Sequence, residues 1–226
     1  LYLMRAPDLA EARDLRERID DIARGAALMT GTSVDIEFVK ACSNILPNRT
    51  LSQVLQANMD ELGAPVFTDE EKAYAESFRA TMELKSNAYY MSLINDVTDE
   101  AERAALLKDA EAPLHELVLP LSPVERSSAA SSDVGDVSVV CPTAQISMAT
   151  MPNGTAMHSW QEVAVGKSSL AHKGMLQAGK VIAGAAMDLL MDPDRVKAAK
   201  AEMDQRTGGK AFESPIPADV KPPMGR

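Results

Sequence analysis

The first 41 residues constrain the fold more than any other stretch, because they change from one hydrophobic pattern to another and back. Residues 2–4 are apolar and β-prone, and Pro7 ends them. Residues 12–29 place apolar side chains three and four positions apart, as one face of a helix does. Residues 34–38 alternate apolar and acidic side chains, which is typical of a half-buried strand. The stretch therefore predicts strand, helix and strand in a two-layer α+β arrangement.

A breaker-rich link at residues 43–48 gives the predicted domain boundary. Residues 1–45 form the smaller predicted domain and residues 46–226 the larger one. In the larger domain, polar residues that favour helix N-caps precede several helical patterns. One helix is predicted to begin after Thr68, and we interpret Glu71 as its capping residue rather than as a catalytic carboxylate.

The last third of the chain predicts two strands and a long helix. Residues 137–140 are short, continuous and apolar, as a buried strand is, and residues 145–150 are a second strand candidate. Residues 168–192 predict a long helix with small side chains on one face, which allow a neighbouring layer to approach closely. Together these patterns predict an α/β fold in which helices pack on a sheet.

Charge and hydropathy exclude two classes of partner. The 226-residue chain has a net charge of −10, and nucleic-acid binders need a basic surface. Lys, Asp or Gly interrupts every apolar stretch, so we expect no membrane-spanning segment. The first residues do not resemble a signal peptide, and we expect a cytoplasmic protein.

No catalytic motif is complete in this sequence, and a histidine in a turn is the best single candidate. His158 lies between the turn at residues 152–155 and a predicted helix, with Met157 and Trp160 beside it. Neutral imidazole is a common zinc ligand. From the residues alone, His158 is either a metal ligand or a loop histidine that only forms hydrogen bonds.

Two aspartates form the second candidate. Asp133 and Asp136 flank Gly135 and precede the predicted strand at 137–140, so they either line a site or accept hydrogen bonds from backbone amides in a turn. The other two histidines receive structural interpretations. We expect His172 to be partly buried in the long helix and His115 to have a packing or surface role.

Several stretches together resemble one family, above all "SSDVGDVSVVCPTAQI" and "GTAMHSWQEVAVGKSSLAHKGMLQAGKV", with "ERIDDIARGAALMTGTSVDIEFVKACSNILPN", "FTDEEKAYA" and "KPP". They are similar to the C-terminal half of aminobenzoyl-glutamate hydrolase B-type proteins. Those proteins are amidohydrolases of the co-catalytic zinc peptidase family, which also includes aminoacylases and carboxypeptidase G.

The resemblance implies a metal centre and indicates which residues of this chain would lie at or near it. His158 matches the last metal ligand of the family. The active site of that family holds two zinc ions, although manganese or cobalt also suits such ligands. Asp133 and Asp136 match an acidic motif near the metals, where relatives more often have Gly-Ser-Glu-Asp-Phe. Ser159 and Trp160 complete the string around His158 and are near-site candidates. The general-base glutamate is expected upstream, so no catalytic residue is assigned within this chain.

The resemblance also implies a fold, partners and a function. The expected fold is part of a mixed-sheet zinc-peptidase catalytic domain flanked by helices, with residues 1–45 ending a ferredoxin-like α+β lid domain that forms a homodimer. The expected substrate is a small amide that joins an N-acyl or aminobenzoyl group to a glutamate-like amino acid. The chain would be a C-terminal half and inactive alone. The alternative is a non-catalytic dimerisation or regulatory module derived from the same family.

Overall fold

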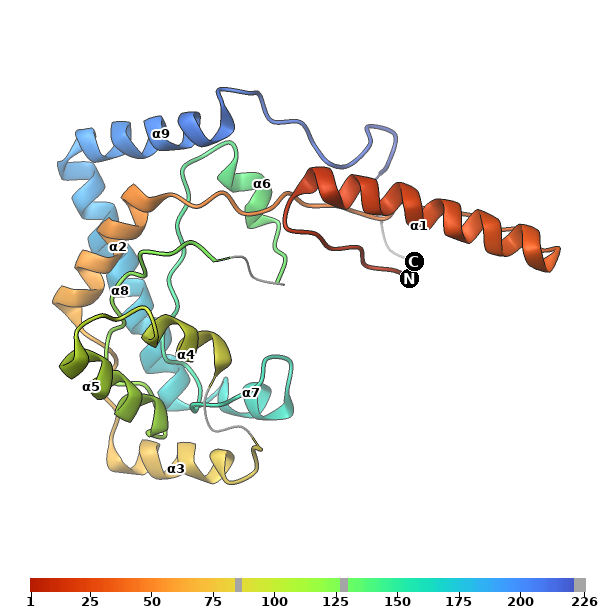
Figure 1. Ribbon diagram of the computed structural model, residues 1–226. Helices are drawn as coiled ribbons and strands as arrows, with labels where there is room; N and C mark the ends of the chain where they lie inside the picture. Colours follow the sequence, from red (N-terminus) through yellow and green to blue (C-terminus); the bar gives the residue numbers. More distant parts are fainter. Residues whose placement is uncertain (84–86, 127–129, 222–226) are drawn as a thin grey trace. The chain divides into compact units, whose positions relative to one another are not determined.

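The computed structural model describes residues 1–83, 87–126 and 130–221 of the chain (Figure 1). These residues form α1 (Leu9–Thr30), α2 (Arg49–Leu62), α3 (Asp69–Arg79), α4 (Ala88–Ile94), α5 (Glu100–Glu111), α6 (Val134–Ser138), α7 (Trp160–Val165), α8 (Ser169–Met191) and α9 (Pro193–Thr207). In this part of the chain, no helix combines the length and the apolar character needed to cross a membrane.

The predicted sheet is wrong, because the described residues contain helices and no strand. Residues 34–38 run as irregular chain, and Val34 and Ile36 are 41% and 42% exposed. Residues 137–140 fall at the end of α6 and in the turn after it. A strand needs a neighbour whose backbone groups complete a ladder, and no described segment provides one. The α/β class, with its mixed sheet and ferredoxin-like lid, therefore does not describe this fold.

The chain divides into two compact units, and each of them is discontinuous in sequence. The first unit contains residues 1–48, 126–143 and 200–226, and the second contains residues 49–125 and 144–199. The domain boundary near residue 45 stays a prediction.

In the first unit, α1 begins and ends where its sequence signals place it. The Asp8 carboxylate caps the helix by accepting a hydrogen bond from the Glu11 backbone N–H at 2.9 Å. Gly31 ends the helix with a φ of 66°, in the left-handed region that glycine adopts readily. The Arg16 guanidinium lies 4.5 Å from the centre of the Phe38 ring, so the segment after α1 folds back along the helix.

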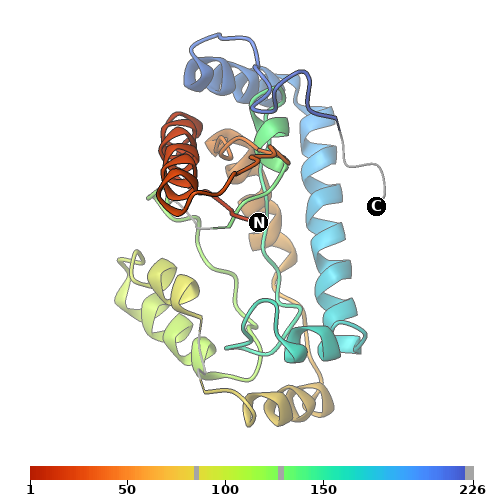
Figure 2. The same cartoon turned by 90° about the vertical axis from the view of Figure 1, so that its right-hand side faces the viewer.

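In the second unit, α8 packs against α2, and both views show the two helices side by side (Figures 1 and 2). Val54 of α2 and Val181 of α8 are buried. The Asn58 amide donates a hydrogen bond to the Asp188 carboxylate at 2.7 Å. A Cβ atom at Gly184 would lie 2.1 Å from the side-chain oxygen of Asn58, so a larger residue there would have to displace the Asn58 side chain.

The other end of α8 is crossed closely by an irregular segment. A Cβ atom at Gly174 would lie 2.1 Å from the backbone oxygen of Ala149. Because this oxygen belongs to the backbone, a change of side-chain rotamer cannot relieve the overlap. Ala149 and Met151 pack against a buried apolar cluster that includes Leu170 of α8. Gly174 therefore allows residues 149–151 to lie directly on the helix, and these residues lead into the turn that carries His158.

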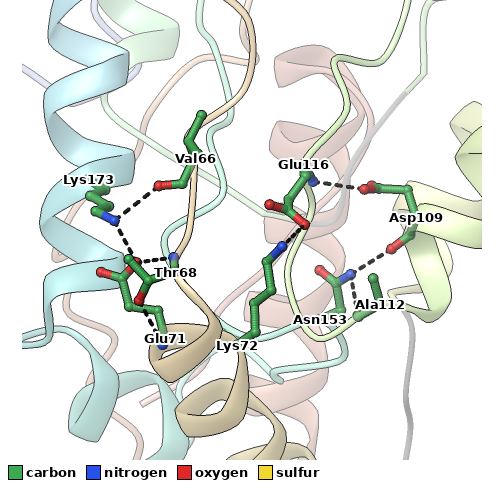
Figure 3. Close-up of polar contacts among 9 residues, drawn as sticks. All are labelled: Val66, Thr68, Glu71, Lys72, Asp109, Ala112, Glu116, Asn153 and Lys173. Atoms are coloured by element: carbon green, nitrogen blue, oxygen red, sulfur yellow. Dashed lines mark hydrogen bonds and ion pairs between the residues drawn. The ribbon is translucent and has the colours of Figure 1, made fainter.

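Glu71 ties the start of α3 to α8 (Figure 3). Its carboxylate accepts hydrogen bonds from Lys173 Nζ at 2.6 Å, Ser169 Oγ at 2.6 Å and the Thr68 backbone N–H at 2.8 Å. Burial, the largest single influence, raises the pKa of Glu71, but these hydrogen bonds and the charge of Lys173 together lower it from 4.5 to about 2. The capping role predicted for Glu71 is confirmed, since Thr68 and Glu71 form a capping box.

The close crossing at Gly174 predicts opposite effects for two glycine substitutions in α8. Gly174→Ala should lower the free energy of unfolding by about 1–3 kcal/mol, because its methyl group would overlap the Ala149 backbone. Gly179→Ala is the matched control, since a Cβ atom there meets nothing within 4 Å, and it should raise stability by up to about 1 kcal/mol. Urea unfolding of both variants measures this difference. Equal stability of the two variants would show that the crossing is not tight.

The low pKa of Glu71 predicts a pH-dependent contribution to stability. Because the folded pKa lies below the unfolded value, the contribution is fully present above about pH 4.5 and is lost as the pH falls towards 2. Glu71→Gln should therefore cost about 1–3 kcal/mol at pH 7 and much less near pH 2. The exposed Asp69→Asn, in the same helical turn, is the control. Urea unfolding at several pH values tests this, and a loss that does not change with pH would contradict it.

Candidate functional site

His158 lies on an exposed turn directly before α7, in the second unit. Its φ is 62°, and among the described residues it is the only non-glycine residue with a positive φ. Its backbone N–H donates a hydrogen bond to the Glu162 carboxylate, whereas its imidazole forms no hydrogen bond within the described part of the chain. A left-handed backbone costs a non-glycine residue roughly 1–2 kcal/mol, and such residues cluster at functional sites. The turn thus fixes the backbone and leaves the imidazole available to a ligand.

Ser159 and Trp160 fix the start of α7 behind this imidazole. Ser159 is the N-cap, and its Oγ accepts a hydrogen bond from the Glu162 backbone N–H at 3.3 Å. Trp160 is 61% exposed, and its ring centre lies 5.8 Å from that of Phe78 in α3. Both residues therefore have structural contacts. A role for either of them beside a metal stays a prediction.

The base of the turn is buried and rigidly held, in contrast to its tip. Asn153 is only 4% exposed, and its amide donates hydrogen bonds to the backbone oxygens of Asp109 at 3.1 Å and Ala112 at 2.9 Å (Figure 3). The Asn153 backbone N–H donates to Pro113 at 2.9 Å. Thr155 is also buried, and its hydroxyl donates to Pro152 at 2.6 Å. The Asn153 contacts anchor the turn to the end of α5, five residues before His158.

A buried carboxylate organises the same end of α5. Asp109 accepts hydrogen bonds from the Tyr90 hydroxyl at 3.1 Å and the Glu116 backbone N–H at 2.8 Å, and its Oδ2 lies 2.8 Å from His115 Nδ1, within hydrogen-bond distance. The rings of Tyr90 and His115 stack with centres 3.7 Å apart. Burial, and then the charge and hydrogen bond of Asp109, raise the pKa of Tyr90. The sequence predicts a packing or surface role for His115, and the stacking on Tyr90 is a packing contact.

A hollow of about 290 Å³ lies beside α7 and the first turns of α8. Its lining is mainly apolar and includes Met151 and Met175, with Glu162 and His172 as the titratable groups. The prediction that His172 is partly buried is wrong, because the residue is exposed at this surface. Glu162 connects the hollow to the His158 turn, since its carboxylate also accepts the His158 backbone N–H.

Asp133 and Asp136 belong to the first unit, where α6 lies on residues 43–46. Asp136 Oδ1 accepts hydrogen bonds from the backbone N–H of Ser43 at 2.9 Å and from its hydroxyl at 2.6 Å. A Cβ atom at Gly135 would lie 1.9 Å from the Ser43 backbone oxygen. Asp133 is exposed and does not cap the helix. Asp136 thus has a structural role in docking α6, and a role for either aspartate near a metal stays a prediction.

The described residues do not form a complete metal site. Within residues 1–83, 87–126 and 130–221, no three His, Cys, Asp or Glu side chains come together in a way that holds a metal ion. Catalytic zinc sites generally use three protein ligands. His158 has the donor atoms and the exposure of one ligand, and the described part of the chain does not complete a set of three ligands around it.

Sequence reasoning missed the anchors at Asp109 and Asn153. Asp109 binds residues six and seven positions further along the chain, across the end of a helix, and Asn153 binds backbone oxygens more than 40 positions away. Only the Pro-Asn-Gly sequence of the turn signalled that Asn153 has a local structural role. Its burial depends on a fold that residue spacing does not reveal.

Comparison with known proteins shows one long match and one short match. The chain is 39% identical over 224 residues, 98% of its length, to the B-type component of p-aminobenzoyl-glutamate hydrolase from Escherichia coli (strain K12). It is also 35% identical over 71 residues, 31% of its length, to Xaa-Arg dipeptidase of Mus musculus, of which it covers 16%. No family model and no solved structure matches the chain.

The long match covers 46% of the Escherichia coli protein, so the chain spans about half the length of that relative. At this identity, chance similarity does not explain a match that runs through almost every residue. The resemblance predicted from the sequence is therefore confirmed: over nearly its whole length, the chain is related to the aminobenzoyl-glutamate hydrolase B-type proteins.

Proposed function

We propose that this chain is part of a hydrolase that cleaves the amide bond between an aminobenzoyl or N-acyl group and a glutamate-like amino acid. The match over 98% of the chain to the B-type component of p-aminobenzoyl-glutamate hydrolase carries this proposal. The dipeptidase match supports the same reaction class, because a dipeptide is also held together by an amide bond. The acidic net charge is compatible with a small-molecule substrate.

The proposal includes a divalent metal, zinc or else manganese or cobalt, with His158 as one ligand. The exposed imidazole on a turn with a buried base supports this role, since a metal ligand needs a fixed backbone and a free ring nitrogen. The remaining ligands and the general base would come from outside this chain. A bound metal would polarise the carbonyl of the scissile amide bond and activate a water. Homodimer formation through residues 1–45 stays a prediction.

The chain alone should not hydrolyse aminobenzoyl-glutamate, with or without added zinc, manganese or cobalt. One imidazole binds a metal weakly, and the described residues bring no three His, Cys, Asp or Glu side chains together to hold one. Release of aminobenzoate from purified chain, followed by absorbance, measures this. Robust turnover that a chelator abolishes would contradict the proposed division of the site between this chain and residues outside it.

His158 can be tested in a restored chimaera, which we define as this chain joined to the unmatched part of the Escherichia coli relative in that relative's own order. We expect His158→Ala to lower turnover of aminobenzoyl-glutamate more than about 100-fold, because even residues that only support metal ligands contribute 10–100-fold. Bound metal, measured by mass spectrometry, should also fall. The control is His115→Gln, which changes a histidine that is already bound to Asp109.

Two results of this experiment would count against the proposal. Full metal content in the His158→Ala chimaera would remove the ligand role of His158. A folded, metal-loaded chimaera that does not cleave aminobenzoyl-glutamate or any N-acyl glutamate would remove the proposed reaction while leaving the ligand role intact.

A further inference from the structure

One face of α8 carries a continuous row of exposed apolar side chains. Six large ones are between 55% and 84% exposed, namely Met175, Leu176, Ile182, Met187, Leu190 and Met191. Gly179, Ala183 and Ala186 lie exposed among them. The row, hereafter the α8 apolar face, extends over 17 residues, from Met175 to Met191, or about 25 Å of helix. The polar side chains exposed along it are His172 and Lys180.

The opposite face of α8 is already occupied within the second unit. Val181 and Ala185 are buried on the side that packs against α2, and Gly174 lies under residues 149–150. The helix therefore carries apolar side chains on two opposite faces, and only one of these faces is buried within the second unit. Single exposed apolar residues are common, but a contiguous row of this extent marks an interface.

We propose that the α8 apolar face is the docking surface for the part of the longer protein that this chain does not match. The chain covers 46% of its Escherichia coli relative, so more than half of that protein lies outside the matched region. A polypeptide of that size has its own apolar surface to bury. The α8 apolar face is a long, nearly uncharged surface of the second unit against which that apolar surface can be buried.

This inference concerns assembly and does not depend on the proposed reaction. An inactive relative with the same two parts would use the same surface. A second copy of this chain is the competing occupant, because exposed Gly and Ala residues also allow two identical helices to approach closely. The experiment must therefore separate protection by the other part of the protein from protection by self-association.

The test compares cysteine labelling in the chain alone and in the restored chimaera. Ile182→Cys is introduced after Cys42 and Cys141 have been changed to serine, and the rate of reaction with a small maleimide is measured. We expect the cysteine at position 182 to react at least about tenfold more slowly in the chimaera than in the chain alone. Val124→Cys is the matched control, since Val124 is 52% exposed outside α8 and should react at similar rates in both.

Two outcomes would overturn the inference. One is equal labelling of position 182 in the two proteins when circular dichroism and cooperative unfolding show that the chimaera is folded. The other is labelling of the chain alone that slows as its concentration rises, with no further protection in the chimaera, which would make a second copy the occupant. If the chimaera does not fold, the cysteine is placed at the aligned position of the full-length Escherichia coli relative, and fast labelling there would equally overturn it.

Discussion

The close approach of backbone to α8 at Gly174 is the contact on which the second unit depends. It lets residues 149–151 lie on the helix, and the Met151 side chain then joins the buried cluster around Leu170. Close by on the same helix, Lys173 and Ser169 bind the carboxylate of Glu71 and so fix α3. Helix α8 thus positions both the segment that leads into the His158 turn and α3, whose Phe78 contacts the Trp160 ring.

The His158 turn combines a rigid base with an exposed tip, and this combination is what a ligand-binding loop requires. Asn153 is buried and bound to the end of α5, whereas His158 has a left-handed backbone and is exposed. The energy that holds the unfavourable backbone comes from the surrounding contacts, including the hydrogen bond from His158 N–H to Glu162. The geometry supports the proposed ligand role without completing a metal site.

Sequence reasoning succeeded where the determining contacts are local. The predicted helix at residues 168–192 corresponds to α8 (Ser169–Met191), and the Thr68 cap of α3 is present as predicted. Both depend on residues within one or two helical turns. The predicted strands failed because a strand is completed by a distant partner, and the pattern at 34–38 contains no information about whether that partner exists. For the same reason, the docking of Asp136 on Ser43, 93 positions away, was not visible from spacing.

The proposed metal site can be located directly by anomalous diffraction at the zinc absorption edge, using crystals of the restored chimaera. We expect a peak about 2.0–2.1 Å from a ring nitrogen of His158, with the other ligands supplied by the part outside this chain. Zinc bound elsewhere in the chimaera, with the His158 imidazole free, would contradict the metal-ligand role of His158.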